Sequence, residues 1–159
     1  MKKLFPVSVI LTLGILLSGC PYETAIPIDK PIINIDSKLL GTWEEMQDHD
    51  MYKVTRKDDH TYLIDITELK ENKVTHNAAY ASVVNGITFL NMWENKAGEP
   101  EKIYSFYKIE MKDPNNLKVY PVTSNIREKF SSSSELKKFI ADNMGNSYFF
   151  EPEANFIRR

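Results

Sequence analysis

The chain has almost no cysteine, and this sets its first limits. Cys20 is the only cysteine among 159 residues, so no disulfide can form within the chain. Positive charge is not in excess either, because 20 Lys and Arg stand against 22 Asp and Glu. A surface that binds nucleic acid needs clustered positive charge, which this balance does not favour. The composition therefore argues against a nucleic-acid partner.

The recognisable motifs of enzymes are also missing. The sequence has no Gly-x-Ser-x-Gly elbow, Walker loop, His-Glu-x-x-His or dinucleotide fingerprint. The run Ser131 to Ser134 could suggest a nucleophile, but serine at the start of a helix is explained by capping. We therefore expect a protein without catalytic residues or a cofactor. An envelope enzyme built from scattered side chains stays as a third alternative, to be tested by replacing His49 and His60.

Two short clusters hold possible metal ligands, Asp48-His49-Asp50 and Asp58-Asp59-His60. They could face each other across one hairpin, but adjacent residues of a strand point to opposite sides. Turns are also rich in Asp for conformational reasons. Neither cluster has the spacing of a zinc or calcium motif, so we expect no metal site. His76 stands alone and is expected to be a strand-edge residue.

A long apolar run occurs only at the start. Lys2 and Lys3 precede an apolar stretch from Leu4 to Leu17, which is short for a bilayer span and has the layout of a secretory signal. It ends in Leu17-Ser18-Gly19-Cys20, which resembles the lipobox of bacterial lipoproteins. The resemblance implies that residues 1–19 are a signal peptide and that the Cys20 thiol is diacylated. The alternative is a plain secretion signal with a free cysteine near the cleavage site.

Acylation at Cys20 would make the remaining chain a lipid-anchored domain of the cell envelope. Residues 1–19 hold two lysines and no acid, so 18 basic residues face 22 acidic ones afterwards, a net charge of −4. The length of the remaining chain, residues 20–159, suits one domain. Pro21 stands where many Gram-negative inner-membrane lipoproteins carry Asp, which by resemblance favours the outer membrane.

Residues 20–36 are expected to be a tether that carries the lipidated cysteine. Pro21, Pro27 and Pro31 favour extended, semi-rigid chain, which at roughly 3 Å per residue could reach about 50 Å. Five isoleucines argue against a linker that is free along its whole length, because free linkers are usually more polar. We predict a spacer up to about Thr24 and partial docking on the domain after it. These isoleucines are Ile26, Ile28, Ile32, Ile33 and Ile35.

The rest of the chain, 37–159, reads as one domain of consecutive strands. Asn85-Gly86 is the strongest short hairpin signal, because both residues tolerate the positive φ of a type I′ turn. On the strand around Ile64, the side chains of Tyr62 and Ile66 share its face. The expected strands are 41–46, 51–56, 61–69, 74–84, 87–93, 102–111 and 117–122, and extended chain is expected again at 148–150 and 155–158.

One segment changes to a helical period. Ser132 and Glu135 form a capping box, and apolar residues follow at helical spacing at Leu136, Phe139, Ile140 and Met144. Gly145 is expected to end the helix in the left-handed conformation. The sequence therefore predicts a mainly β protein: an antiparallel up-and-down barrel, or a strongly curled meander of seven or eight strands, with one late amphipathic helix.

Gly41-Thr42-Trp43 gives this prediction a second support. The tripeptide resembles the opening of lipocalin-like (calycin) domains, in which the Trp on the first strand closes the barrel floor. The resemblance implies that a late arginine, Arg158 or Arg159, packs across Trp43. This chain departs from the family by placing its helix before the last strand.

Seventeen aromatic residues follow residue 19, and they can either fill the core or line a pocket. We expect a membrane-anchored protein with a non-catalytic binding role, with a small apolar ligand inside the barrel. The alternative is an interaction module of an envelope complex, such as an accessory subunit or inhibitor, with an exposed apolar patch. The candidate ligand-binding residues are Tyr62, Tyr80, Phe89, Trp93, Tyr104, Phe106 and Tyr120.

Overall fold

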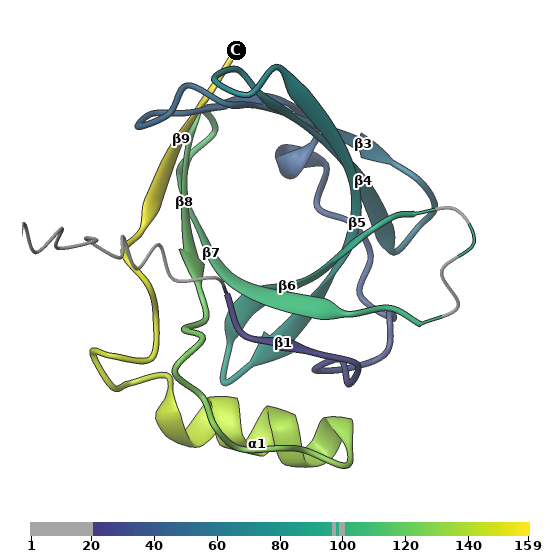
Figure 1. Cartoon of the computed structure of the whole chain (residues 1–159), viewed down its shortest axis with the longest axis vertical. Coiled ribbons are helices and arrows are strands. Elements are labelled where there is room, and N and C mark those ends of the chain that lie inside the picture. The colour runs from purple at the N-terminus through teal and green to yellow at the C-terminus, as the bar shows by residue number, and fades with distance from the viewer. Residues whose placement is uncertain (1–20, 97, 99–100) are drawn as a thin grey trace, which may run out of the picture.

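Eight antiparallel strands close into a barrel, seen end-on in Figure 1. The structure, a computed structural model, describes residues 21–96, 98 and 101–159. The strands follow one another around the ring in chain order, and the last pairs with the first. The expected barrel is therefore confirmed over the open meander. Its strands are β2 (Gly41–Glu45), β3 (Met51–Arg56), β4 (Thr61–Glu68), β5 (Lys73–Val84), β6 (Ile87–Glu94), β7 (Tyr104–Asp113), β8 (Asn116–Pro121) and β9 (Ala154–Arg158). Within the extended chain expected at 148–150, Phe150 forms a single bridge to Val122.

Because consecutive strands run in opposite directions, their connections alternate between the two ends of the barrel. The end that carries the turns at 57–60, 85–86 and 114–115 is called the Leu39 end here. The Pro21 end carries the loops at 46–50 and 69–72 and the connection from β6 to β7. The predicted hairpin turn lies at the Leu39 end, where Asn85 and Gly86 have φ angles of 48° and 79°.

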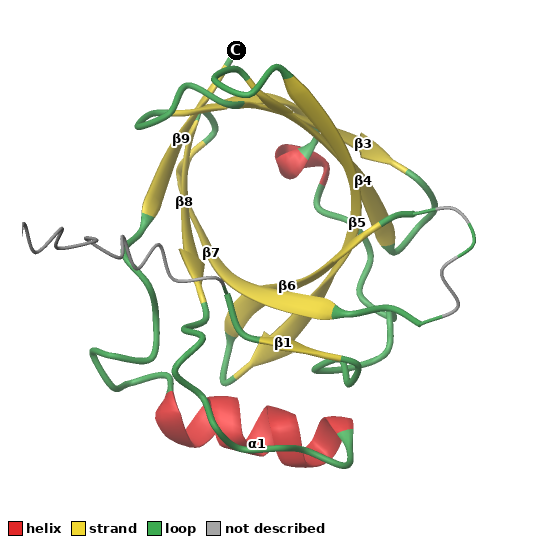
Figure 2. Ribbon diagram, in the orientation of Figure 1, coloured by secondary structure: helices red, strands yellow, loops and turns green. Residues whose placement is uncertain are grey.

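The inside of the barrel is lined by an apolar cluster, called the inner cluster here. Side chains from all eight barrel strands contribute to it, which is possible only within the ring. The short 3-10 helix η1 (Ser37–Leu39) adds Leu39 and is seen within the outline of the ring in Figure 2. Tyr62, Ile64 and Ile66 share the inward face of β4, as their spacing predicted. The buried members are Leu39, Trp43, Tyr62, Ile64, Ala79, Leu117 and Phe156.

A second cluster, the outer cluster, lies on the outside of β5, β6 and β7. Helix α1 (Ser133–Asn143) stands outside the ring in Figure 1 and covers this cluster with Leu136 and Ile140, each 1% exposed. Alternate side chains of a strand point to opposite faces. Outward-facing residues of these three strands are therefore as well buried as inward-facing ones.

The helix begins as its sequence predicted. The Ser132 hydroxyl accepts the backbone N–H of Glu135, while the Glu135 carboxylate accepts the backbone N–H and the hydroxyl of Ser131. The helix ends at Asn143 with Met144 as its C-cap, and Gly145 has no positive φ. The predicted left-handed stop at Gly145 is therefore wrong. Within the described ranges, no helix is long and apolar enough to cross a membrane.

The amino-terminal segment, residues 21–36, packs along the barrel. Strand β1 (Glu23–Thr24) pairs with the start of β7, and Pro21 bridges Thr123. The predicted free spacer up to Thr24 is therefore wrong, because the backbone there joins the sheet. The predicted docking after it is confirmed at Ile28, which is fully buried in the outer cluster.

A buried polar contact holds this segment in place. The Ile28 N–H donates to Oδ1 of Asn91 at 2.8 Å, and Nδ2 of Asn91 donates to the Ser82 hydroxyl at 2.8 Å. Asn91 and Ser82 have no exposed surface, so these bonds satisfy polar groups that water cannot reach. Farther along, the Tyr80 hydroxyl donates to the carbonyl of Asp29 at 2.6 Å.

Candidate functional site

The structure separates the seven aromatic residues predicted to line one internal pocket. Only Tyr62 among them belongs to the inner cluster. Tyr120 lies on the outer side of β8, where its ring packs against Phe150 and the Lys108 ammonium. The prediction of one shared internal pocket is therefore wrong. Its other five residues lie in the outer cluster: Tyr80, Phe89, Trp93, Tyr104 and Phe106.

The inside of the barrel is nevertheless not filled. Several apolar side chains that point inward keep part of their surface exposed, although they are surrounded by a closed ring of strands. Small barrels with a filled interior bury such residues. Partial exposure at these positions indicates open space in the lumen. The residues are Tyr52, Val54, Ile66, Leu90, Met92, Ile109, Met111 and Val119.

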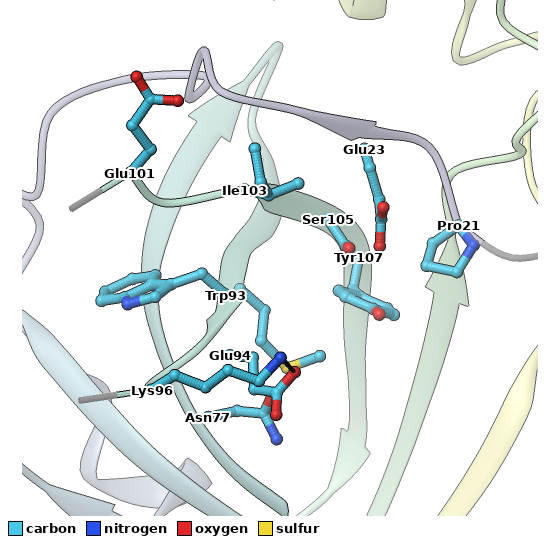
Figure 3. Close-up of a pocket in the computed structure, with 11 residues that line it drawn as sticks. Pro21, Glu23, Asn77, Trp93, Glu94, Lys96, Glu101, Ile103, Ser105 and Tyr107 are labelled. Carbon is cyan, nitrogen blue, oxygen red and sulfur yellow. Dashed lines mark ion pairs between the residues drawn. The ribbon is translucent and has the colours of Figure 1, made fainter. Parts of the chain in front are cut away.

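The larger opening of the lumen lies at the Pro21 end and has a volume of about 360 Å³. Inward-facing residues of β5, β6 and β7 form its depth: Asn77, Met92, Ser105 and Tyr107. Figure 3 shows Glu23 of β1 descending toward Ser105 and Tyr107, with Pro21 beside it on the rim. This opening is called the Pro21 pocket below.

Two tyrosine hydroxyls in the interior are held in their neutral form by their surroundings. Burial raises the pKa of Tyr107 to about 12, against a smaller lowering by its hydrogen bond with Ser105. Burial also raises the pKa of Tyr52, and the nearby Asp50 and Tyr107 raise it further. Both phenols are therefore neutral at physiological pH and can donate a hydrogen bond to a bound polar group.

The opposite end has a smaller opening of about 190 Å³. It is lined by the amino-terminal segment and by inward-facing residues such as Ala81, Thr88 and Met111. Tyr62 reaches it, and its hydroxyl accepts the backbone N–H of Asp36 at 2.6 Å. This bond holds the segment across the Leu39 end and narrows it.

Three of the displaced aromatic residues line an external cleft of about 370 Å³ instead. Tyr80, Trp93 and Tyr104 contact one another there, with ring centres 5.6 to 6.2 Å apart. Each is less than 10% exposed, and Lys102 covers Trp93 with its ammonium 4.2 Å from the ring centre. The aromatic floor of this cleft is therefore largely shielded.

The two candidate metal clusters lie at opposite ends of the barrel. Asp48-His49-Asp50 forms the loop from β2 to β3, and Asp58-Asp59-His60 the turn from β3 to β4. The His49 ring is 2.6 Å from Glu44, and Asp58 accepts backbone N–H groups of its own turn. In the part of the chain that the structure describes, no three His, Cys, Asp or Glu side chains converge as metal ligands. His76 is exposed on β5 with its ring 2.7 Å from Asp65.

The residues that were expected to close the barrel floor lie close together. Trp43, 1% exposed, lies in the inner cluster, and the Arg158 guanidinium carbon is 4.3 Å from its ring centre. Arg159 instead pairs with Glu44. Of the two arginines expected to pack across Trp43, Arg158 is therefore the one that does so.

Sequence reasoning missed most residues of the lumen, including Tyr52, Met92 and Tyr107. The sequence pattern could have found them. Every second residue along a strand lies on one face of the sheet, and residues paired across neighbouring strands also share a face. Tyr62 could therefore have served as the starting point for identifying the other inward-facing residues. Tyr62 pairs with Ala79, and Ala79 with Met92, which leads from β4 to the inward face of β6.

Cys20 lies outside the described residues. Comparison with family models, curated proteins and solved structures finds no match to this chain.

Proposed function

We propose that this protein is a lipid-anchored binding protein of the cell envelope, without catalytic activity, that holds a small ligand with an apolar body in its barrel. The observation that carries the proposal is the partly exposed apolar lining of a closed barrel. Met92 and Leu90 face this space from β6, and Ile109 and Met111 face it from β7. An apolar group placed there would cover surface that the protein itself leaves open to water.

The anchor and the ligand site are adjacent in this proposal. A peptide bond joins Cys20 to Pro21, and Pro21 lies on the rim of the Pro21 pocket. Because the amino-terminal segment is docked, acyl chains on Cys20 would hold the barrel close to the membrane, with this opening near the anchor. Pro21, which follows Cys20 where many inner-membrane lipoproteins carry Asp, favours the outer membrane.

Anchoring is tested by growing cells with labelled palmitate. The full chain should incorporate the label and remain with the membrane fraction, whereas Cys20→Ser should lose both properties. A full chain that stays unlabelled would contradict the anchor. That result would leave ligand binding untouched, because the pocket consists of residues after Cys20.

Ligand binding is tested by native mass spectrometry. The strands, both clusters and the docked segment all lie within residues 21–159, so a secreted chain starting at residue 20 with Cys20→Ser retains the whole barrel. Purified from a membrane-containing host, it should carry an added mass that organic solvent extracts. Met92→Trp should fill the lumen and remove that mass, whereas the outward-facing control Met51→Trp should keep it. A bare protein that stays bare after incubation with lipid extract would contradict the proposal.

An interaction module of an envelope complex is the second candidate. Four exposed apolar side chains support it, all of them at the Pro21 end: Met46, Leu69, Val74 and Ile103, between 43% and 55% exposed. Among the isoleucines after Pro27, Ile32 is 73% exposed, but Ile28 is fully buried. Crosslinking in intact membranes, comparing the unaltered chain with Leu69→Ser and Val74→Ser, tests this function. A partner lost on both substitutions would favour it.

A further inference from the structure

The Pro21 pocket carries more negative than positive charge. Among the described residues its lining includes Glu23, Glu94 and Glu101, against one cation, Lys96. Lys96 is already engaged, with its ammonium 2.9 Å from Glu94, as the dashed line in Figure 3 marks. The charge left over is that of Glu23, beside the phenol of Tyr107, and that of Glu101 farther out on the rim. A positively charged group is therefore favoured at this opening, and a carboxylate is disfavoured.

A polar side chain also lines the pocket. Asn77 is only 8% exposed, and its amide nitrogen has a long hydrogen bond of 3.4 Å to the Thr75 hydroxyl. The Tyr107 hydroxyl lines the same pocket near the Glu23 carboxylate and can accept a hydrogen bond from a ligand.

The pocket also has an apolar part. Met92 faces the lumen from β6, and Trp93 and Ile103 line the pocket as well. The Lys102 ammonium already lies over the Trp93 ring, which leaves Glu23 as the partner for a cationic head. A ligand with a cationic head beside Glu23 and an apolar chain toward Met92 matches both regions.

We infer that the Pro21 pocket binds a primary amine with an apolar chain, its ammonium held by Glu23 and Tyr107. An ammonium group donates hydrogen bonds, which suits a carboxylate and a phenol oxygen. This inference rests on the proposed binding function and adds the chemical class of the ligand. Fatty acids, which share the apolar chain but carry a carboxylate, are disfavoured in the pocket by the same charges.

The test compares three probes of equal chain length by titration calorimetry: decylamine, decanol and decanoate. The protein is residues 20–159 with Cys20→Ser and a short neutral leader, so that no terminal amine lies beside Pro21. Decylamine should bind about fivefold more tightly than decanol, the size of a partly exposed ion pair, and decanoate more weakly than either. Glu23→Gln should remove the preference for the amine while decanol binding stays the same.

Glu71→Gln is the matched control, because it removes the same charge from an exposed turn at the same end of the barrel. It should leave the amine preference intact. Equal binding of decylamine and decanol, or tightest binding of decanoate, would overturn the inference while leaving binding in the lumen in place. Failure of all three probes to bind would overturn the proposed function as well.

Discussion

Arg158 lies over Trp43, with its guanidinium carbon 4.3 Å from the centre of the indole ring. The same guanidinium donates hydrogen bonds to the carbonyls of Leu40 at 2.7 Å, Pro114 at 2.8 Å and Lys38. Trp43 in turn donates from its indole nitrogen to the carbonyl of Leu39 at 2.9 Å. One residue of the last strand thus joins the start of β2 to the turn between β7 and β8 and closes the Leu39 end.

Gly41 is the residue that lets Arg158 approach. Its φ is +128°, and a Cβ there would lie 2.7 Å from Nη1 of Arg158. We expect Gly41→Ala to lower the free energy of unfolding by about 2 kcal/mol, from backbone strain and the steric clash together. Urea denaturation measures this. Gly145→Ala is the control, because a Cβ there meets nothing within 4 Å and should change stability little.

The clash and the strain at Gly41 can be separated. In an Arg158→Ala background the clash is gone, so Gly41→Ala should cost clearly less than in the unaltered chain. Arg158→Ala alone should cost about 2 kcal/mol for its lost bonds to carbonyl groups. Additive effects of the two substitutions would contradict the close approach of residues 41 and 158.

The buried amide of Asn91 should control docking of the amino-terminal segment. Asn91→Leu leaves the buried N–H of Ile28 without an acceptor, and we expect a loss of about 3 kcal/mol. Hydrogen exchange at the Ile28 amide should accelerate strongly. Ser82→Ala should have a smaller effect, because Asn91 keeps the Tyr80 carbonyl as an acceptor. Unchanged exchange at Ile28 in Asn91→Leu would show that the segment is held by other contacts.

Stability should fall in acid partly through Glu110. Hydrogen bonds with Lys112 and then Lys108 lower the pKa of this carboxyl from 4.5 to about 2. Because the pKa is lower in the folded state, the contribution is present above pH 4.5 and is lost as the pH falls toward 2. The group is partly exposed, so the effect is small. Glu110→Gln should therefore reduce the difference between urea midpoints at pH 6 and pH 3.

We expect stability also to fall in alkali, through Tyr107 in the lumen. The pKa of Tyr107 is raised from 10 to about 12 in the folded protein. Stability linked to this phenol is complete below pH 10 and is lost as the pH rises toward 12. Tyr107→Phe should flatten that part of the stability curve, followed by denaturant midpoints between pH 9 and 11. An unchanged curve would indicate that this hydroxyl is hydrated.

The sequence by itself determined most of the strands, the Asn85-Gly86 hairpin and the start of the helix, but it left a closed barrel and a curled meander as alternatives. These local elements follow from periodicity, capping and turn chemistry between residues close together in the chain. Tertiary structure decided which face of each strand is internal. Helix α1 buries the outside of β5 to β7, so Phe89 and Phe106 are as buried as any lumen residue. A large apolar side chain on these strands therefore does not show which face lies inside the barrel. It also decided that residues 21–36 dock, and that Glu23, Asn77 and Tyr107 share one pocket. These residues come from three separate strands, and the pairing of β1 with β7, and of β7 with β6 and β6 with β5, brings them to one pocket.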